Sequence, residues 1–167
     1  MKEILFAKIR DGAVIPTKRE EDAGFDIYSC FEDDYMVVLP HHTVLIPTGI
    51  ISAFDPGYVM VLKERGSTGK LGIGQRSGVI DSGYRGEWLV PITNHGTNPL
   101  VICKNEDVVK RLKHLDGYLY CLYPYSKAIC QALLLEVPHA ASREVTPEEV
   151  LAVPSERGDG KFGSSGK

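Results

Sequence analysis

The sequence is poor in cysteine, in aromatic residues and in net charge. Four cysteines are scattered through 167 residues, with no CxxC pair and no histidine at zinc-binding spacing, which argues against a structural zinc site. The sequence contains 19 lysines and arginines and 22 aspartates and glutamates. This mild acidity argues against binding a nucleic-acid polymer, because phosphate neutralisation dominates such binding. The mild acidity does not exclude a small anionic ligand bound by backbone amides, arginines or a metal.

Long hydrophobic runs are also missing. No stretch approaches the roughly 20 apolar residues that a membrane helix needs. The start MKEILFAKIR lacks an uninterrupted apolar segment and a small-residue cleavage site, so we expect no signal peptide. These absences predict a cytoplasmic protein with reduced thiols and no membrane partner.

Most of the chain reads as short β-branched, aromatic or alternating segments separated by turn residues. Regular short strands of this kind favour an all-β sandwich or barrel-like domain over a βαβ layout. The length is that of one domain. The expected strands are 5–9, 25–29, 35–40, 43–51, 58–64, 87–92, 100–104, 118–123 and 132–137.

Two segments are typical of short helices. Asn105 can cap a helix over 106–115, in which Val108, Leu112 and Leu115 form one apolar face. The run from Thr146 to Glu149 is a capping box with proline at the first helical position, so a helix of one or two turns is expected to end near Pro154. The polar, glycine-rich stretch that follows has almost nothing to bury.

Five short segments carry polar groups suited to binding or catalysis, and each has a plainer structural interpretation. Asp26 in AGFDIYS could be a turn carboxylate, and the loop ERGSTGKLGI could be a glycine-rich hairpin or a set of anion-binding amides around Arg65. Asp81 in SGVIDSGYRGEW could cap a turn, and Gln131 opens an apolar strand where its amide must find partners. The segment RGDGKFGSSGK could be a disordered terminus.

Taken in order, these segments resemble the five motifs of the homotrimeric dUTPase family. The matching runs are AGFDIYS, ERGSTG, GVIDSGYRGE, KAICQALLLEV and RGDGKFGSSGK. The resemblance implies an all-β, distorted jelly-roll or β-barrel-like subunit with one or two short helices. It divides the chain into a β domain over 1–153 and a flexible, glycine-rich C-terminal arm over 154–167, which closes over the active site.

The resemblance also implies the activity. Family members hydrolyse dUTP to dUMP and pyrophosphate with Mg²⁺, at three active sites between the subunits of a homotrimer. On that template Asp81 is the general base that activates the attacking water. Mg²⁺ is held by triphosphate oxygens and waters, with Asp26 acting through one of those waters.

Substrate contacts follow from the same template. Uracil and deoxyribose are contacted by the hairpin around Gly78, Val79 and Ile80, by the ring of Tyr84, which excludes a 2′-hydroxyl, and by Phe162 stacked on the base. The phosphate-binding residues are Arg65, Gly66, Ser67, Gln131, Arg157, Gly163, Ser164 and Ser165.

The sequence departs from the family pattern in three places. Gly66 follows Arg65 where a serine is usual, and Tyr125-Ser126-Lys127 replaces a Gly-Asp-Arg turn. The segment 95–123 is longer than the usual link, so it would be an insertion. Two alternatives stay open: a dCTP deaminase of the same fold, and a dUTP-responsive regulatory protein that binds a partner through 95–123.

Overall fold

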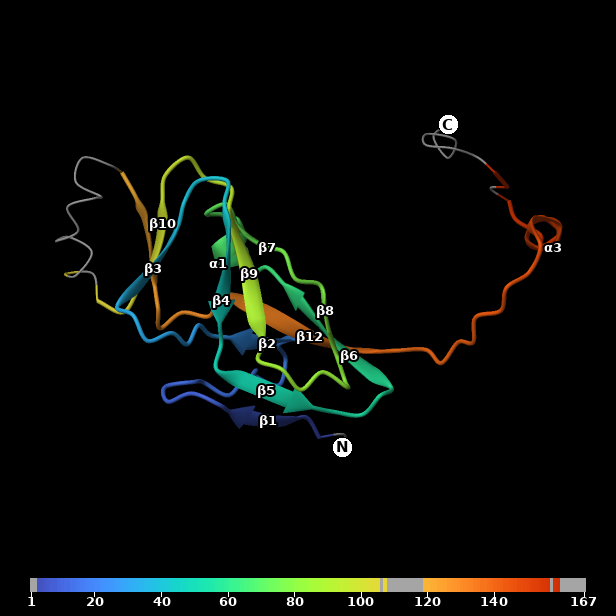
Figure 1. Cartoon of the computed structure of the whole chain (residues 1–167), viewed down its shortest axis with the longest axis horizontal. Coiled ribbons are helices and arrows are strands. Elements are labelled where there is room, and N and C mark those ends of the chain that lie inside the picture. The colour runs from blue at the N-terminus through green and yellow to red at the C-terminus, as the bar shows by residue number, and fades with distance from the viewer. Residues whose placement is uncertain (1–2, 106, 108–118, 157, 160–167) are drawn as a thin grey trace. The chain divides into compact units, whose positions relative to one another are not determined.

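The computed structural model describes residues 3–105, 107, 119–156 and 158–159. It divides into two compact units, Met1–Val137 and Pro138–Lys167. The first unit holds the β-strands and the second a short helix, α3 (Pro147–Leu151) (Figure 1). In the described residues no helix has the length and apolar character needed to cross a bilayer. The predicted division at residues 153 and 154 stays a prediction.

Strands fill the first unit, as the sequence predicts. Antiparallel pairing dominates, and β10 with β11 is a parallel pair. The strands are β1 (Leu5–Lys8), β2 (Gly24–Ile27), β3 (Tyr35–Val38), β4 (Thr43–Pro47), β5 (Ile50–Ala53), β6 (Tyr58–Lys63), β7 (Ile73–Gln75), β8 (Val79–Asp81), β9 (Leu89–Asn94), β10 (Leu100–Cys103), β11 (Cys121–Pro124) and β12 (Cys130–Glu136).

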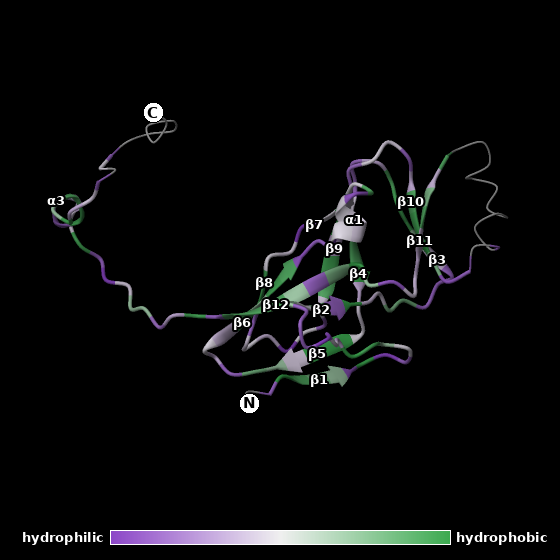
Figure 2. Ribbon diagram, turned by 180° about the vertical axis from the view of Figure 1, so that it is seen from behind, coloured by the Kyte–Doolittle hydropathy of each residue, from purple (hydrophilic) through white to green (hydrophobic). Residues whose placement is uncertain are grey.

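These strands form four small sheets, in the orders β1-β5, β11-β10-β3, β2-β12-β6-β8 and β4-β9-β7. The predicted all-β class is confirmed: the sheets make a distorted, jelly-roll-like arrangement and not a closed barrel. Apolar residues concentrate on strands such as β9 and β10, whereas the connections are largely polar (Figure 2).

The core forms where alternating residues of the strands face inward. In β6, Met60 and Leu62 are fully buried, whereas Lys63 at the end of the strand is exposed. The indole of Trp88 is fully buried and donates from Nε1 to Ser52 Oγ at 3.1 Å. The largest fully buried side chains also include Ile27, Ile46, Ile50, Ile92, Leu100, Ile102 and Ile129.

Two local expectations are wrong. The predicted strand over 43–51 is interrupted after Pro47, because Gly49 has φ +67° and a Cβ there would lie 2.9 Å from Ala13 Cβ. The loop after Arg65 is not a hairpin but a single helical turn, α1 (Gly66–Gly69). Thr68 Oγ1 stabilises this turn, because it accepts from Arg65 N at 3.1 Å and donates to Arg65 O at 2.9 Å.

The two predicted helices have different outcomes. In α3 the capping box is confirmed: Thr146 Oγ1 accepts from Glu149 N at 3.3 Å, and Glu149 Oε2 accepts from Thr146 N at 3.0 Å. The helix predicted over 106–115 lies outside the described residues, except for Asp107, whose amide donates to Asn105 Oδ1 at 2.9 Å.

The Glu87 carboxylate joins three distant segments of the first unit. Its Oε2 pairs with Arg10 Nη2 at 3.0 Å, and its Oε1 accepts from Gly49 N at 2.8 Å. The hydrogen bond from Arg10 lowers the pKa of Glu87, burial opposes that shift, and the Gly49 amide adds to it. Because its pKa is lowered in the folded protein, Glu87 stabilises the fold above its unfolded pKa, and this contribution is lost as pH falls through the folded value.

We therefore expect Glu87→Gln to lower the free energy of unfolding at pH 7 by on the order of 1 kcal/mol, a figure discounted for the solvent that still reaches the pair. The difference from the wild type should shrink below about pH 4, as Glu87 takes up a proton. Urea unfolding at several pH values measures this, with the exposed Glu20→Gln as control. A difference that stays constant down to low pH contradicts the assignment.

Candidate active site

Three polar side chains share one rung of the sheet β2-β12-β6-β8. Gln131 of β12 pairs with Asp26 of β2 on one side and with Lys63 of β6 on the other. Directly paired residues of antiparallel strands project from the same face. Their neighbours Ile27, Leu62 and Cys130 are buried in the core, so the polar rung belongs to the opposite, outer face.

Arg65 lies two residues beyond Lys63 and reaches back across this face. Its Nε is 3.0 Å from Asp26 Oδ1, and its Nη2 is 3.4 Å from Asp26 Oδ2. Its Nη1 also donates to Ala128 O at 3.3 Å. Paired contacts of this kind fix the plane of a guanidinium as well as its position. Arg65 is thus held in place with part of its surface still open to solvent.

Gln131 is fixed through its amide and depends on a close glycine. Its Nε2 donates to Glu64 O at 2.9 Å, next to Arg65 in the chain. A Cβ on Gly24 would lie 2.7 Å from Gln131 Oε1. Only a residue without a side chain at position 24 leaves this amide its observed orientation.

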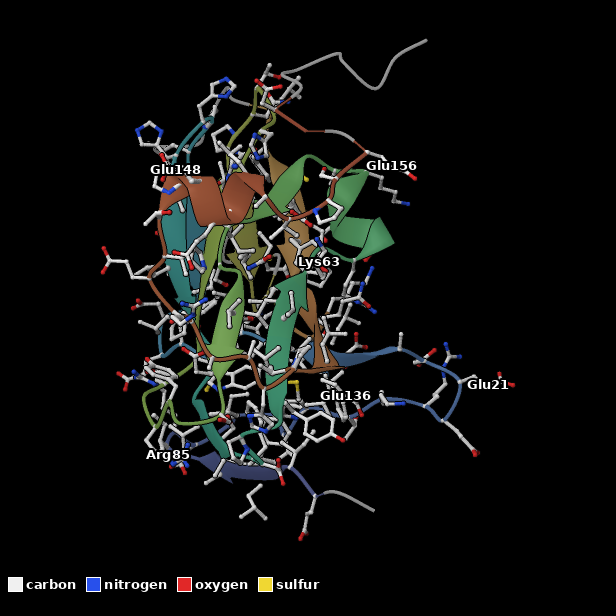
Figure 3. The ribbon with its side chains drawn as sticks, turned by 90° about the vertical axis from the view of Figure 1, so that its right-hand side faces the viewer. Glu21, Lys63, Arg85, Glu136, Glu148 and Glu156 are labelled. Atoms are coloured by element: carbon white, nitrogen blue, oxygen red, sulfur yellow. The ribbon has the colours of Figure 1, made fainter. Side chains whose placement is uncertain are left out.

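A groove of about 880 Å³ opens over this cluster. Its far wall is the loop that precedes β2, with Glu21 at the projecting tip of that loop, while Lys63 lies on β6 (Figure 3). Lys18 Nζ donates to Asp22 O at 2.7 Å, and Arg19 pairs with Asp22 at 2.8 Å. The groove is lined by Thr17, Lys18, Arg19, Glu21, Asp22, Ala23, Gly24, Asp26, Arg65, Gln131 and Leu133.

The structure brings together the first, second and fourth of the predicted segments. Asp26, Arg65 and Gln131 line one groove, and Gly66 and Ser67 follow Arg65 in α1. Sequence reasoning missed Lys63 and the loop from Thr17 to Asp22. The alternation of YVMVLK, which turns Lys63 outward with Val59 and Val61, is the one signal that could have found Lys63.

A second cluster surrounds β8. Val79 and Asp81 are exposed, whereas Ile80 is buried, so its side chain packs into the core. Gly78 O accepts from Leu62 N at 3.0 Å, which joins the start of this hairpin to β6.

The turn after β8 is held by its own hydrogen bonds. Tyr84 N donates to Asp81 O at 3.0 Å, and Tyr84 OH donates to Glu87 O at 3.1 Å. Arg85 Nη1 binds the carbonyl oxygens of Ser82 at 2.6 Å and Ser52 at 3.2 Å. The turn therefore presents Asp81 and the half-exposed ring of Tyr84 on a rigid support.

The two clusters lie at opposite ends of β6 within one chain. Asp81 pairs with Val59 near the start of the strand, and Arg65 follows Val59 by six positions. At about 3.3 Å per residue the separation is on the order of 20 Å. A single copy therefore does not bring Asp81 to Arg65. The predicted site residues Arg157, Phe162, Gly163, Ser164 and Ser165 lie outside the described residues.

Comparison with known proteins identifies the class to which this fold belongs. Residues 10–110 match the family model of dUTPase. The chain is 34% identical over 151 residues to the deoxyuridine 5′-triphosphate nucleotidohydrolase of Neisseria meningitidis serogroup C (strain 053442), covering 88% of this chain and 83% of that protein. It is 31% identical over 168 residues to the enzyme of the same name from Fowlpox virus (strain NVSL), covering 99% of each.

The fold agrees with this result. The structure of the Staphylococcus bacteriophage 80alpha dUTPase G164S mutant with dUpNHpp matches with a TM-score of 0.75 at 21% sequence identity, over 99% of each chain. The chain belongs to the dUTPase family.

The close approach of Gly24 to Gln131 can be tested directly. We expect Gly24→Ala to keep the fold, because the atom in the way is the end of a flexible side chain, but to break the hydrogen bond from Gln131 Nε2 to Glu64 O. The side-chain amide resonances of Gln131 in ¹⁵N NMR spectra report this. Gly69→Ala is the matched control, since a Cβ there meets nothing within 4 Å. Unchanged Gln131 resonances in Gly24→Ala would contradict the assigned geometry.

Proposed function

We propose that this protein hydrolyses dUTP to dUMP and pyrophosphate, which limits uracil incorporation into DNA and supplies dUMP. The observation that carries the proposal is the guanidinium of Arg65, fixed by Asp26 beside Gln131 on the wall of an open groove. Family membership supplies the substrate class. Arg65, Ser67 and Gln131 bind the phosphate chain, since a fixed guanidinium, a hydroxyl and an amide are all suited to phosphate oxygens.

Asp81 acts as the general base in this proposal. An exposed carboxylate at the end of β8 can orient a water and accept its proton. The water oxygen attacks the α-phosphorus, and the bond from that phosphorus to the α–β bridging oxygen breaks. That oxygen leaves with the pyrophosphate, and the water's hydroxyl becomes part of dUMP.

The hairpin around Asp81 determines which nucleotide the site accepts. Backbone groups from Gly78 to Tyr84 have fixed positions, so they can read the donor and acceptor order of uracil. The ring of Tyr84, held through its hydroxyl by Glu87 O, packs on deoxyribose and leaves no room for a 2′-hydroxyl. Phe162, on the C-terminal arm, stacks on the base, while Arg157 and the amides around Gly163, Ser164 and Ser165 hold the outer phosphates.

Mg²⁺ is the proposed cofactor, and the residues present fit a metal bound mainly by its substrate. The described residues contain no group of three or more His, Cys, Asp or Glu side chains able to hold an ion. Asp26 is paired with Arg65, so it suits a hydrogen bond to metal-bound water better than direct ligation. Mg²⁺ keeps several waters when it binds phosphates, and it would supply charge neutralisation there.

A homotrimer is the proposed assembly, because the two halves of the site lie at opposite ends of β6. The outer face between them is apolar: Val59 pairs with Asp81 and Leu135, and Val61 pairs with Val79 and Leu133. A head-to-tail contact that sets Asp81 of one copy against Arg65 of the next completes a site, and such contacts close into a ring of three when each turns the next copy by a third of a rotation. The expected location remains the cytoplasm.

Hydrolysis is tested by measuring Mg²⁺-dependent pyrophosphate release from dUTP, UTP, dTTP and dCTP. We expect dUTP to be strongly preferred, and Asp81→Asn to lower kcat by about 10²-fold or more. Asp33→Asn, in an exposed turn, is the control and should match the wild type. Ammonia release from dCTP would favour the deaminase, and wild-type turnover by Asp81→Asn would remove Asp81 from the mechanism.

The shared site predicts complementation between two inactive variants. Arg65→Ala and Asp81→Asn should each be nearly inactive alone. Co-expressed with different tags and purified as mixed trimers, they should recover about a third of the wild-type rate. Every 2:1 or 1:2 trimer has one junction of three at which a subunit that keeps Arg65 meets, in the required order, a subunit that keeps Asp81. Mixed trimers that stay as inactive as either parent would show that each site lies within one subunit.

A further inference from the structure

Tyr123 of β11 lies beneath the phosphate-binding residues. The residue is 3% exposed, and it lines the same small internal space as Thr68 of α1, the residue whose hydroxyl holds the turn after Arg65. Tyr123 also lies outside residues 10–110, which the family model matches. The ring shares a small internal space with Thr68, Ile73, Ile92, Leu100, Ile102 and Ile129.

The phenol and Arg65 share one acceptor. Tyr123 OH donates to Ala128 O at 2.6 Å, and Arg65 Nη1 donates to the same oxygen at 3.3 Å. A carbonyl oxygen has two lone pairs, so these two donors satisfy it. Ala128 leads into β12, the strand of Gln131. The Tyr123 hydroxyl thus ties β11 to the guanidinium and to the strand beside it.

The charge of Arg65 also acts on the phenol. Burial raises the pKa of Tyr123, while the nearby charge of Arg65 opposes that shift. The phenol therefore stays protonated near neutral pH, with its proton directed to Ala128 O.

We propose that Tyr123 is a positioning residue, which holds Arg65, through Ala128 O, in the orientation that binds the phosphate chain of the substrate. The inference rests on the proposed function and extends it to a residue below the groove. Asp26 fixes Nε and Nη2 of Arg65 from one side. On the other side Nη1 donates to Ala128 O, which the Tyr123 hydroxyl holds in place. Without the hydroxyl, Ala128 O loses one of its two donors and its link to β11, so the carbonyl that accepts from Nη1 is held less firmly.

The test is Tyr123→Phe, which removes one oxygen and keeps the ring that fills the core. We expect KM for dUTP, and the inhibition constant of inorganic triphosphate, to rise about three- to tenfold, as the loss of one hydrogen bond implies. Inhibition by deoxyuridine, which lacks phosphates, should be unchanged. Tyr125→Phe is the matched control: its ring packs edge-to-face on Phe31 at 4.9 Å, away from Arg65, and it should match the wild type in all three assays.

A double-mutant cycle separates positioning from general loosening of the core. In an Arg65→Lys background, Tyr123→Phe should change KM less than twofold, because its effect passes through the guanidinium. Equal losses in both backgrounds, weaker deoxyuridine binding, or a Tyr123→Phe enzyme with wild-type KM would each overturn the inference. A wild-type protein that does not hydrolyse dUTP would instead overturn the proposed function, which separates the two failures.

Discussion

The register of β12 between β2 and β6 is the constraint on which the site depends. This strand pairs on both sides, and the pairing puts Gln131 level with Asp26 and Lys63. A slip of one residue would turn Gln131 into the core and bring the buried Ala132 to the surface. The packing of Cys130 and Ala132, both fully buried, therefore fixes the polar rung. Core and site are specified by the same alternation of residues.

The same strand pairing separates the chemistry into two halves. Arg65 lies beyond one end of β6 and Asp81 lies beside the other, with apolar side chains between them on the outer face. An enzyme built within one subunit would have no use for this separation. The proposed trimer explains the separation, because one contact between subunits buries the apolar face and also completes the site. Assembly and activity would then depend on the same surface.

Sequence patterns predicted those elements that depend on interactions between residues close together in the chain. Alternation predicted most strands, and the capping box of Thr146 and Glu149 predicted α3. The break at Gly49 was missed because it depends on Ala13, far away in the chain. The turn α1 was missed because Gly-Ser-Thr-Gly is a weak helix former, and Thr68 overrides that preference. Arg65 and Asp26 stood out as polar residues in short segments, and the family resemblance assigned their roles. The ion pair between them could not be predicted from the sequence, because it depends on how β2 and β6 are placed in the fold.

The charges that line the groove explain why the chain needs help to bind a polyanion. Lys18, Arg19 and Arg65 face Glu21, Asp22 and Asp26, so the lining is close to neutral. Arg65 is also partly neutralised by its own partner, Asp26. A triphosphate carries several negative charges, and a neutral groove cannot offset them. This balance supports two features of the proposal, a divalent metal bound with the nucleotide and Arg157 of the C-terminal arm, because each adds positive charge only when the substrate is present.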